Sequence, residues 1–268
     1  MHLTNREGHR AYYMQPDWTV GRAPGLSALV RLHNEEEWIA PCLESLVGWC
    51  DQIVVVLNCC TDRTPEIVQR FWAVYRGKFS VFDYPFKIAP MGPGHDDCPD
   101  DSVHSSAYFY NFTQSKSVYS HVVKIDGDMV MMDWAGAAIR KLMDEGRDRI
   151  RFEGRDIVGD QAVHIGCHPV CRTNGVYKVK NGVMYKQGPV TQNLQGVPDA
   201  DDAFGHRPAF LHFKWSRKPL ESATVQWPSD WRSIPHFQRI YERRKPVARY
   251  EGEYPAAVRR MLEEERAA

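Results

Sequence analysis

Residues 52–64, QIVVVLNCCTDRT, decide the fold of this chain. The run at 53–57 is apolar at every position, which is typical of a strand buried on both faces between two layers of helices. Polar residues follow at once, and Pro65 suits the first turn of a helix. The predicted helix carries apolar residues at three-to-four spacing, which indicates a buried face made of Ile67, Val68, Phe71 and Val74.

The alternation of strand and helix continues on both sides of this stretch. Strands are predicted at 26–31, 52–57, 79–83, 120–125 and 149–152, and helices at 41–48, 65–76, 102–117 and 134–145. Alternating elements of this kind indicate a mostly parallel sheet. The irregular stretch 87–101 predicts a surface loop, with a mobile lid as the alternative. The predicted fold class is therefore α/β, with a mostly parallel sheet flanked by helices and a C-terminal helical extension.

Composition excludes several classes of protein. The 268 residues carry 34 Lys and Arg against 34 Asp and Glu, so no net field favours a polyanion and a dedicated nucleic-acid binder is disfavoured. The apolar runs are far shorter than the roughly 20 residues of a transmembrane helix. The first ten residues are polar, so neither a signal peptide nor a lipidation motif is expected. Seven cysteines, an odd number, fit reduced thiols and a cytoplasmic location.

Polar side chains follow three of the predicted strands, where the loops of an open parallel sheet converge on a ligand. The loops lie at 33–36, 58–64 and 126–128. Asp126 and Asp128 flank a glycine in the last of these. Two such carboxylates can hold a hard divalent cation while the glycine lets a phosphate approach closely. A solvated Asp-Gly-Asp turn is the alternative.

The order of these motifs resembles the GT-A nucleotide-sugar glycosyltransferases, in particular glycosyltransferase family 2. The stretch 26–46 looks like that family's opening strand, Asn-Glu loop and Cys-Leu-Glu-Ser-Leu helix, and 51–67 is similar to its second strand and nucleotide loop. The family's DxD motif would be residues 126–128. The resemblance is specific over about residues 26–135 and covers little of the chain beyond them.

The resemblance implies a nucleoside diphosphate-sugar donor and Mn²⁺ or Mg²⁺. The residues implied to contact the nucleotide are Arg31, His33, Asn34, Asn58, Asp62 and Asp126. The implied metal ligands are Asp126, Asp128 and His212. A histidine that alternates with apolar neighbours on a strand is the other interpretation of His212. The family often has Asp where Asn58 stands, so the preference for a base does not carry over.

An inverting transferase needs a general base near the acceptor hydroxyl. Asp201 and Asp202 occupy the place of the family's acidic loop and are the predicted catalytic residues, with an acidic surface turn as the alternative. Without a base here, a retaining mechanism stays open. The stretch HIGCHPVC at 164–171 has the residue types of a zinc site, but neighbouring residues on a strand point opposite ways, and a loop that shapes the acceptor pocket is favoured.

The predicted organisation is an N-terminal extension at 1–25, a nucleotide-sugar-binding half at 26–135, an acceptor-binding half at 136–230 and a helical tail at 231–268. The predicted activity is metal-dependent, inverting transfer of a sugar to a hydroxyl of a glycan or lipid-linked acceptor, in bacterial surface polysaccharide synthesis. The basic run at 243–245 could touch anionic lipids at the inner face of the membrane, with a solvated helix face as the alternative.

Two other functions stay open. A catalytically inactive nucleotide-binding module would share the fold, and release of nucleotide from a sugar donor would separate it from an enzyme. A nucleotidyltransferase should carry a Gly-rich, basic phosphate loop after its first strand. Here that loop, residues 33–36, has the sequence HNEE, which is acidic and contains no glycine.

Overall fold

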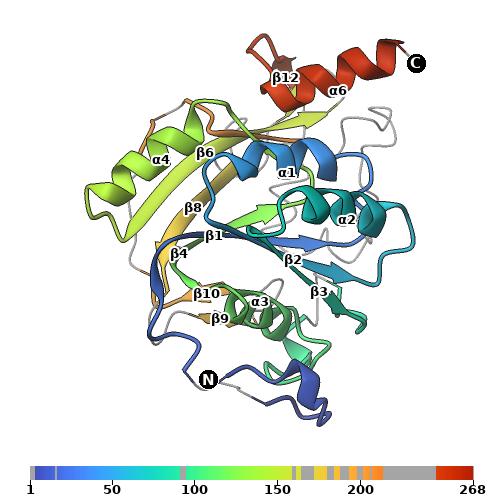
Figure 1. Cartoon of the computed structure of the whole chain (residues 1–268), viewed down its shortest axis with the longest axis vertical. Helices are drawn as coiled ribbons and strands as arrows, with labels where there is room; N and C mark the ends of the chain where they lie inside the picture. The colour runs from blue at the N-terminus through green and yellow to red at the C-terminus, as the bar shows by residue number, and fades with distance from the viewer. Residues whose placement is uncertain are drawn as a thin grey trace. The chain divides into compact units, whose positions relative to one another are not determined.

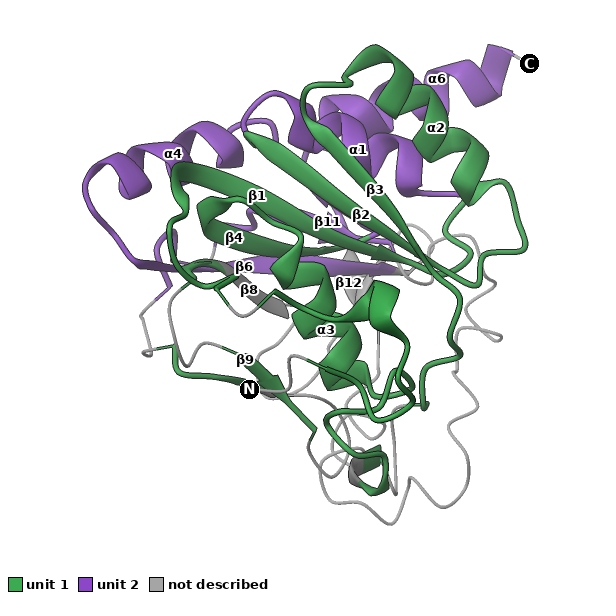
Figure 2. Cartoon of the chain, turned by 60° about the horizontal axis from the view of Figure 1, so that its bottom comes forward, with its two compact units in different colours: residues 1–36, 50–126, 176–200 green, residues 37–49, 127–175, 201–268 purple. Residues whose placement is uncertain are grey.

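The computed structural model describes residues 4–15, 17–90, 95–158, 161–163, 172–179, 184–187, 193–197, 202–205, 207–213 and 246–267. The chain divides into two compact units, coloured separately in Figure 2. Unit 1 contains residues 1–36, 50–126 and 176–200, and unit 2 contains 37–49, 127–175 and 201–268.

Unit 1 is built on four parallel strands in the order β3-β2-β1-β4. They are β1 (Ala23–Leu32), β2 (Gln52–Asn58), β3 (Phe79–Tyr84) and β4 (Tyr119–Asp126). All seven residues of β2 are buried, as its apolar run predicts. The helices α2 (Thr64–Val74) and α3 (Ser106–Ser115) lie on opposite faces of this sheet (Figure 1). The end of β8 (Arg172–Lys178) pairs antiparallel with β4.

The core of unit 1 is rich in aromatic side chains on the α3 face of the sheet. Tyr84, Tyr108 and Phe112 are buried there, and the Tyr84 hydroxyl donates to the Val103 carbonyl over 2.8 Å. The segment before β1, with the short helix η1 (Arg10–Tyr12), contributes Met14 and Trp18 to this core. A second short helix, η2 (His95–Asp97), and the hairpin of β9 (Met184–Lys186) and β10 (Asn193–Gln195) complete the unit.

One detail of the α2 prediction is wrong. Val74 was expected on the buried face, yet its side chain is 73% exposed, and Val68 is buried as expected. Val74 is the last residue of the helix, and of the four residues of the expected face only Val68 is fully buried. The spacing of apolar residues indicates a face but not where packing along that face stops.

Unit 2 has a mixed sheet with β11 (Phe210–His212) at its centre. This strand runs antiparallel to β5 (Met129–Met131) and parallel to β6 (Arg149–Val158). The remaining elements are α1 (Ile39–Val47), α4 (Ala135–Asp144), β7 (Gln161–Val163), β12 (Pro246–Arg249) and α6 (Ala256–Ala267). The rings of Trp38 and Phe213 stack at 4.0 Å in the core of this unit, which also buries Val258 of α6.

The predicted fold class is confirmed: the chain is α/β, with a mostly parallel sheet, flanking helices and a C-terminal helix. The five described cysteines, at 42, 50, 59, 60 and 98, form no disulfide bond, while 167 and 171 lie outside the described residues. Within the part of the chain that is described, no helix is both long and apolar enough to cross a membrane.

Gly154 of β6 tests the packing of unit 2. A Cβ at this position would lie 2.3 Å from the Phe210 ring. We expect Gly154→Ala to lower the free energy of unfolding by about 1–3 kcal/mol, because the core must shift to admit the methyl group. Urea denaturation measures this loss. Gly48→Ala is the control, since nothing lies within 4 Å of its Cβ position. Equal stability of the two variants would contradict the packing described.

Candidate active site

The loops that follow β1 and β2 are joined by hydrogen bonds between side chains and backbone. The Thr61 N–H donates to Asn34 Oδ1 over 2.7 Å, and His33 Nδ1 lies 2.7 Å from the Asn58 carbonyl oxygen. Asn34 and Cys59 have positive φ values of 56° and 49°. Such values are uncommon for residues with a Cβ and recur at functional loops.

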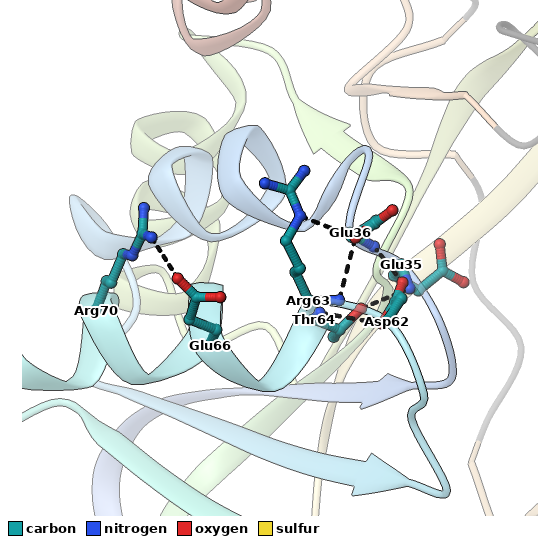
Figure 3. A network of polar contacts seen from close by, with 7 residues as sticks. All are labelled: Glu35, Glu36, Asp62, Arg63, Thr64, Glu66 and Arg70. Atoms are coloured by element: carbon teal, nitrogen blue, oxygen red, sulfur yellow. Dashed lines mark hydrogen bonds and ion pairs between the residues drawn. The ribbon is translucent and has the colours of Figure 1, made fainter.

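The start of α2 is tied to the loop after β1 by a network drawn in Figure 3. Asp62 accepts the Thr64 N–H at Oδ1 and the Glu36 N–H at Oδ2, each over 3.0 Å. Thr64 Oγ1 accepts the Glu35 N–H over 2.7 Å, and Glu36 Oε2 accepts from Arg63 N and Nε. Burial would raise the pKa of Asp62, but these hydrogen bonds outweigh it and lower the pKa.

Three residues predicted to contact a nucleotide therefore already stabilise the backbone conformation through hydrogen bonds. Asn34 and Asp62 join the two loops, and Asn58 Nδ2 donates to the carbonyls of Tyr84 and Phe86 over 2.8 Å each. The structure places all three at the carboxyl ends of β1 and β2, as the motif predicts. Their contact with a nucleotide stays a prediction.

Arg31, near the end of β1, has a different environment. Its side chain is only 8% exposed, and its guanidinium carbon lies 3.6 Å from the centre of the Tyr110 ring. Within the described part of the chain, none of its three side-chain nitrogens has a hydrogen-bond partner. Burial lowers the pKa of Arg31, but the phenols of Tyr110 and Tyr185 and the carboxylate of Asp126 outweigh this effect and raise it. The side chain is a buried cation with unsatisfied donors.

Asp126 lies beside Arg31 in the sheet, because the two residues are register partners of β4 and β1. Its carboxylate is nevertheless paired with another residue: Lys124 Nζ lies 2.8 Å from Asp126 Oδ2. Arg31 therefore lies close to a carboxylate that is itself within ion-pair distance of Lys124.

In unit 2 a buried histidine lies between two carboxylates. His212 Nε2 is 3.0 Å from Asp128 Oδ1, and His212 Nδ1 is 2.5 Å from Asp156 Oδ1. The strands set this arrangement, because His212 of β11 is the register partner of Asp156 on β6. All three side chains are buried. Burial lowers the pKa of His212, but Asp128 and Asp156 outweigh it, so the net shift is upward.

The chemistry of this cluster fits the Mn²⁺ or Mg²⁺ that the resemblance implies. Two ligands about 2.0–2.2 Å from an ion and at right angles to each other lie about 3 Å apart, which matches the spacing of His212 Nε2 and Asp128 Oδ1. Asp156 holds the other ring nitrogen, as carboxylates behind metal-binding histidines do. Among the described residues, no group of three or more His, Cys, Asp and Glu is arranged to hold a metal.

The sequence did not single out Asp156. It lies in the stretch RFEGRDIV at 151–158, where two acidic residues, Glu153 and Asp156, belong to no motif. Its significance appears only when β6 and β11 pair. An acidic residue within an otherwise half-apolar strand was the one available signal, and it is weak because such residues usually face solvent.

Of the predicted general bases, Asp202 lies in the described chain and Asp201 lies outside it. Asp202 forms an isolated bridge with Arg151 of β6, and its Oδ1 accepts the Phe204 N–H over 2.9 Å. A catalytic role for either aspartate stays a prediction. Two other predicted features also lie outside the described residues: the cysteine and histidine cluster at 164–171 and the basic run at 243–245.

No family model matches the sequence, and no curated protein matches it either. Among solved structures, the chain is similar to S. aureus TarS 1–349 in complex with UDP-GlcNAc. That match has 15% sequence identity and a TM-score of 0.46, and it covers 75% of this chain and 62% of the other. It is also similar to glucosyl-3-phosphoglycerate synthase from Mycobacterium tuberculosis in complex with Mn²⁺, UDP and phosphoglyceric acid. That match has 17% identity and a TM-score of 0.33, and covers 52% of this chain and 45% of that one. The chain spans less than two thirds of the length of either structure.

The raised pKa of His212 predicts how stability depends on pH. The folded chain keeps a proton on His212 above pH 6.5, the ordinary value, where the unfolded chain loses it. The stabilising effect is therefore complete below that pH and is lost as pH rises through the raised pKa. We expect the free energy of unfolding, measured by urea titration from acidic to alkaline pH, to fall over this range in the native chain but not in His212→Asn. The exposed His104→Asn is the control and should keep the native slope. Identical slopes in all three would contradict the assignment.

Proposed function

We propose that the chain is a metal-dependent glycosyltransferase that uses a nucleoside diphosphate-sugar as donor. The observation that carries the proposal is the pair of buried donor atoms, Asp128 Oδ1 and His212 Nε2, 3.0 Å apart and supported by Asp156. Asp128 follows two residues after Asp126, at the point where a strand of a parallel sheet ends. That is where open α/β sheets bind their ligands.

The residues of the cluster have separate tasks in this proposal. Asp128 and His212 hold Mn²⁺ or Mg²⁺, and Asp156 keeps the imidazole oriented through its Nδ1. When bound, the ion stabilises the charge that develops on the departing diphosphate, which is the main electrostatic demand of sugar transfer at neutral pH. Burial of all three side chains strengthens their electrostatic interactions with the ion and with each other.

The nucleoside is assigned to unit 1. His33, Asn34, Asn58 and Asp62 belong to loops whose conformation is fixed before any ligand arrives, so binding costs little ordering of the chain. We assign Asp126 a contact with the ribose or the metal. Preorganised loops of this kind favour a specific ligand over a general anion-binding surface.

The finer assignments follow from the same resemblance. The proposed acceptor is a hydroxyl of a glycan or lipid-linked sugar, within bacterial surface polysaccharide synthesis at the cytoplasmic side of the membrane. Asp201 or Asp202 would take the proton of that hydroxyl in an inverting reaction. An inactive nucleotide-binding module is the alternative, and it predicts binding without turnover.

A screen of nucleotides defines the donor. We expect UDP, GDP, CMP or dTDP to raise the melting temperature of the chain when Mn²⁺ is present, since a ligand that binds only the folded state stabilises it by mass action. The shift should be largest for one nucleotide and should decrease when EDTA replaces the metal. Absence of a shift with every nucleotide would contradict the proposed donor class.

Substitution of Asp128 tests the metal site. Asp128→Asn removes a charged ligand, and we expect metal-dependent release of nucleotide from the matching sugar donor to fall by 10²-fold or more, on the order of the loss from removing one group that stabilises transition-state charge. The exposed Asp144→Asn is the control and should keep full activity. Full activity of Asp128→Asn with an unchanged fold would refute the metal assignment, and binding without turnover in the native chain would favour the inactive module.

A further inference from the structure

Two arginines of unit 1 differ in how their hydrogen-bond donors are satisfied. Arg22 is partly buried and uses all three nitrogens: Nε donates to the Tyr119 carbonyl over 2.7 Å, Nη1 to the Trp18 carbonyl over 2.6 Å, and Nη2 to Ser117 Oγ. Arg31 is more deeply buried, and none of its three nitrogens has a partner. The first is a structural arginine, and the second lacks what a structural arginine requires.

The contact with Tyr110 does not replace those hydrogen bonds. The ring stacks against the face of the Arg31 guanidinium, 3.6 Å from its central carbon, whereas the N–H bonds lie in the guanidinium plane and point outward. A cation–π contact stabilises the charge but leaves the donors unsatisfied. Buried donors without acceptors destabilise the folded chain, and an acceptor that binds from outside would remove this cost.

We propose that Arg31 binds a phosphate of the donor and does so without metal. A guanidinium matches two oxygens of a phosphate in a planar fork, and it is the side chain of choice for a buried anion. Lys124 Nζ lies 2.8 Å from Asp126 Oδ2, so a second cation lies close to Arg31 at this end of the sheet. This inference rests on the proposed function for the identity of the donor, and it adds a phosphate-binding residue in unit 1 to the metal ligands of unit 2.

A ring must move to admit the phosphate, because the nitrogens of Arg31 expose no surface. The Tyr185 side chain is buried, and its hydroxyl lies within hydrogen-bond distance of the Tyr177 hydroxyl, at 3.3 Å. Tyr110 is only half-buried and meets Tyr185 edge to face at 4.9 Å. Tyr110 is therefore the side chain that swings away when the ligand enters.

Calorimetric titration in EDTA tests the proposal. The probes are inorganic pyrophosphate, UDP and uridine, with glucuronate as a carboxylate. We expect pyrophosphate and UDP to bind the native chain and to bind Arg31→Met at least tenfold more weakly, while uridine binds both alike. Equal affinity of pyrophosphate for the two chains, or no binding to the native one, overturns the proposal. Arg31-dependent binding of uridine, or of glucuronate in place of pyrophosphate, assigns Arg31 to a base or a sugar acid and overturns it equally.

Stability separates a binding arginine from a structural one. We expect ligand-free Arg31→Met to melt at or above the native temperature, because the substitution removes unsatisfied buried donors, and Arg22→Met to melt lower. A fall for Arg31→Met as large as that for Arg22→Met would make Arg31 structural. Asp128→Asn should still bind pyrophosphate in EDTA, so failure of the metal assignment and failure of this inference give different results.

Discussion

A protonated histidine between two buried carboxylates is the interaction on which the candidate site of unit 2 depends. Asp128, Asp156 and His212 are removed from water, and isolated charges in that environment destabilise a fold strongly. Each buried charge is tolerated because the charges of the other two side chains compensate it. Without a metal, the histidine shares its protons with both carboxylates. Ligation of a cation through Nε2 would release the proton that faces Asp128, so metal binding by this cluster is coupled to loss of a proton.

In unit 1, polar side chains have a different role, because most of them form hydrogen bonds with the backbone. Asn34, Asn58 and Asp62 form hydrogen bonds with the backbone of their own loops, so their polarity shapes the rim of the sheet. Arg31 does the reverse, since it is buried and leaves its donors unsatisfied. Polar residues of a candidate site thus divide into those that build the rim and those whose partners must be supplied by a ligand.

The sequence predicted the parts of the fold that local patterns control. The apolar run of β2 and the alternation of strands and helices were sufficient for the fold class, and the Asp-Gly-Asp motif located the end of β4. Asp156 could not be predicted, because only the pairing of β6 with β11 brings it to His212. The unsatisfied state of Arg31 was equally hidden, since it depends on what every neighbouring side chain does rather than on a motif. The burial of Val74 was predicted wrongly, because the spacing of apolar residues does not show which positions along a helix face are covered.

Electron paramagnetic resonance of Mn²⁺ tests the central claim most directly, because it reports free metal without requiring turnover or a known acceptor. The site offers two protein donors and needs oxygens from a diphosphate to complete the coordination of the ion. The account predicts weak Mn²⁺ binding by the chain alone and much tighter binding when UDP, GDP or dTDP is added, with the gain lost in His212→Asn. Mn²⁺ affinity that is unchanged by every nucleotide, or unaffected by loss of His212, would contradict it.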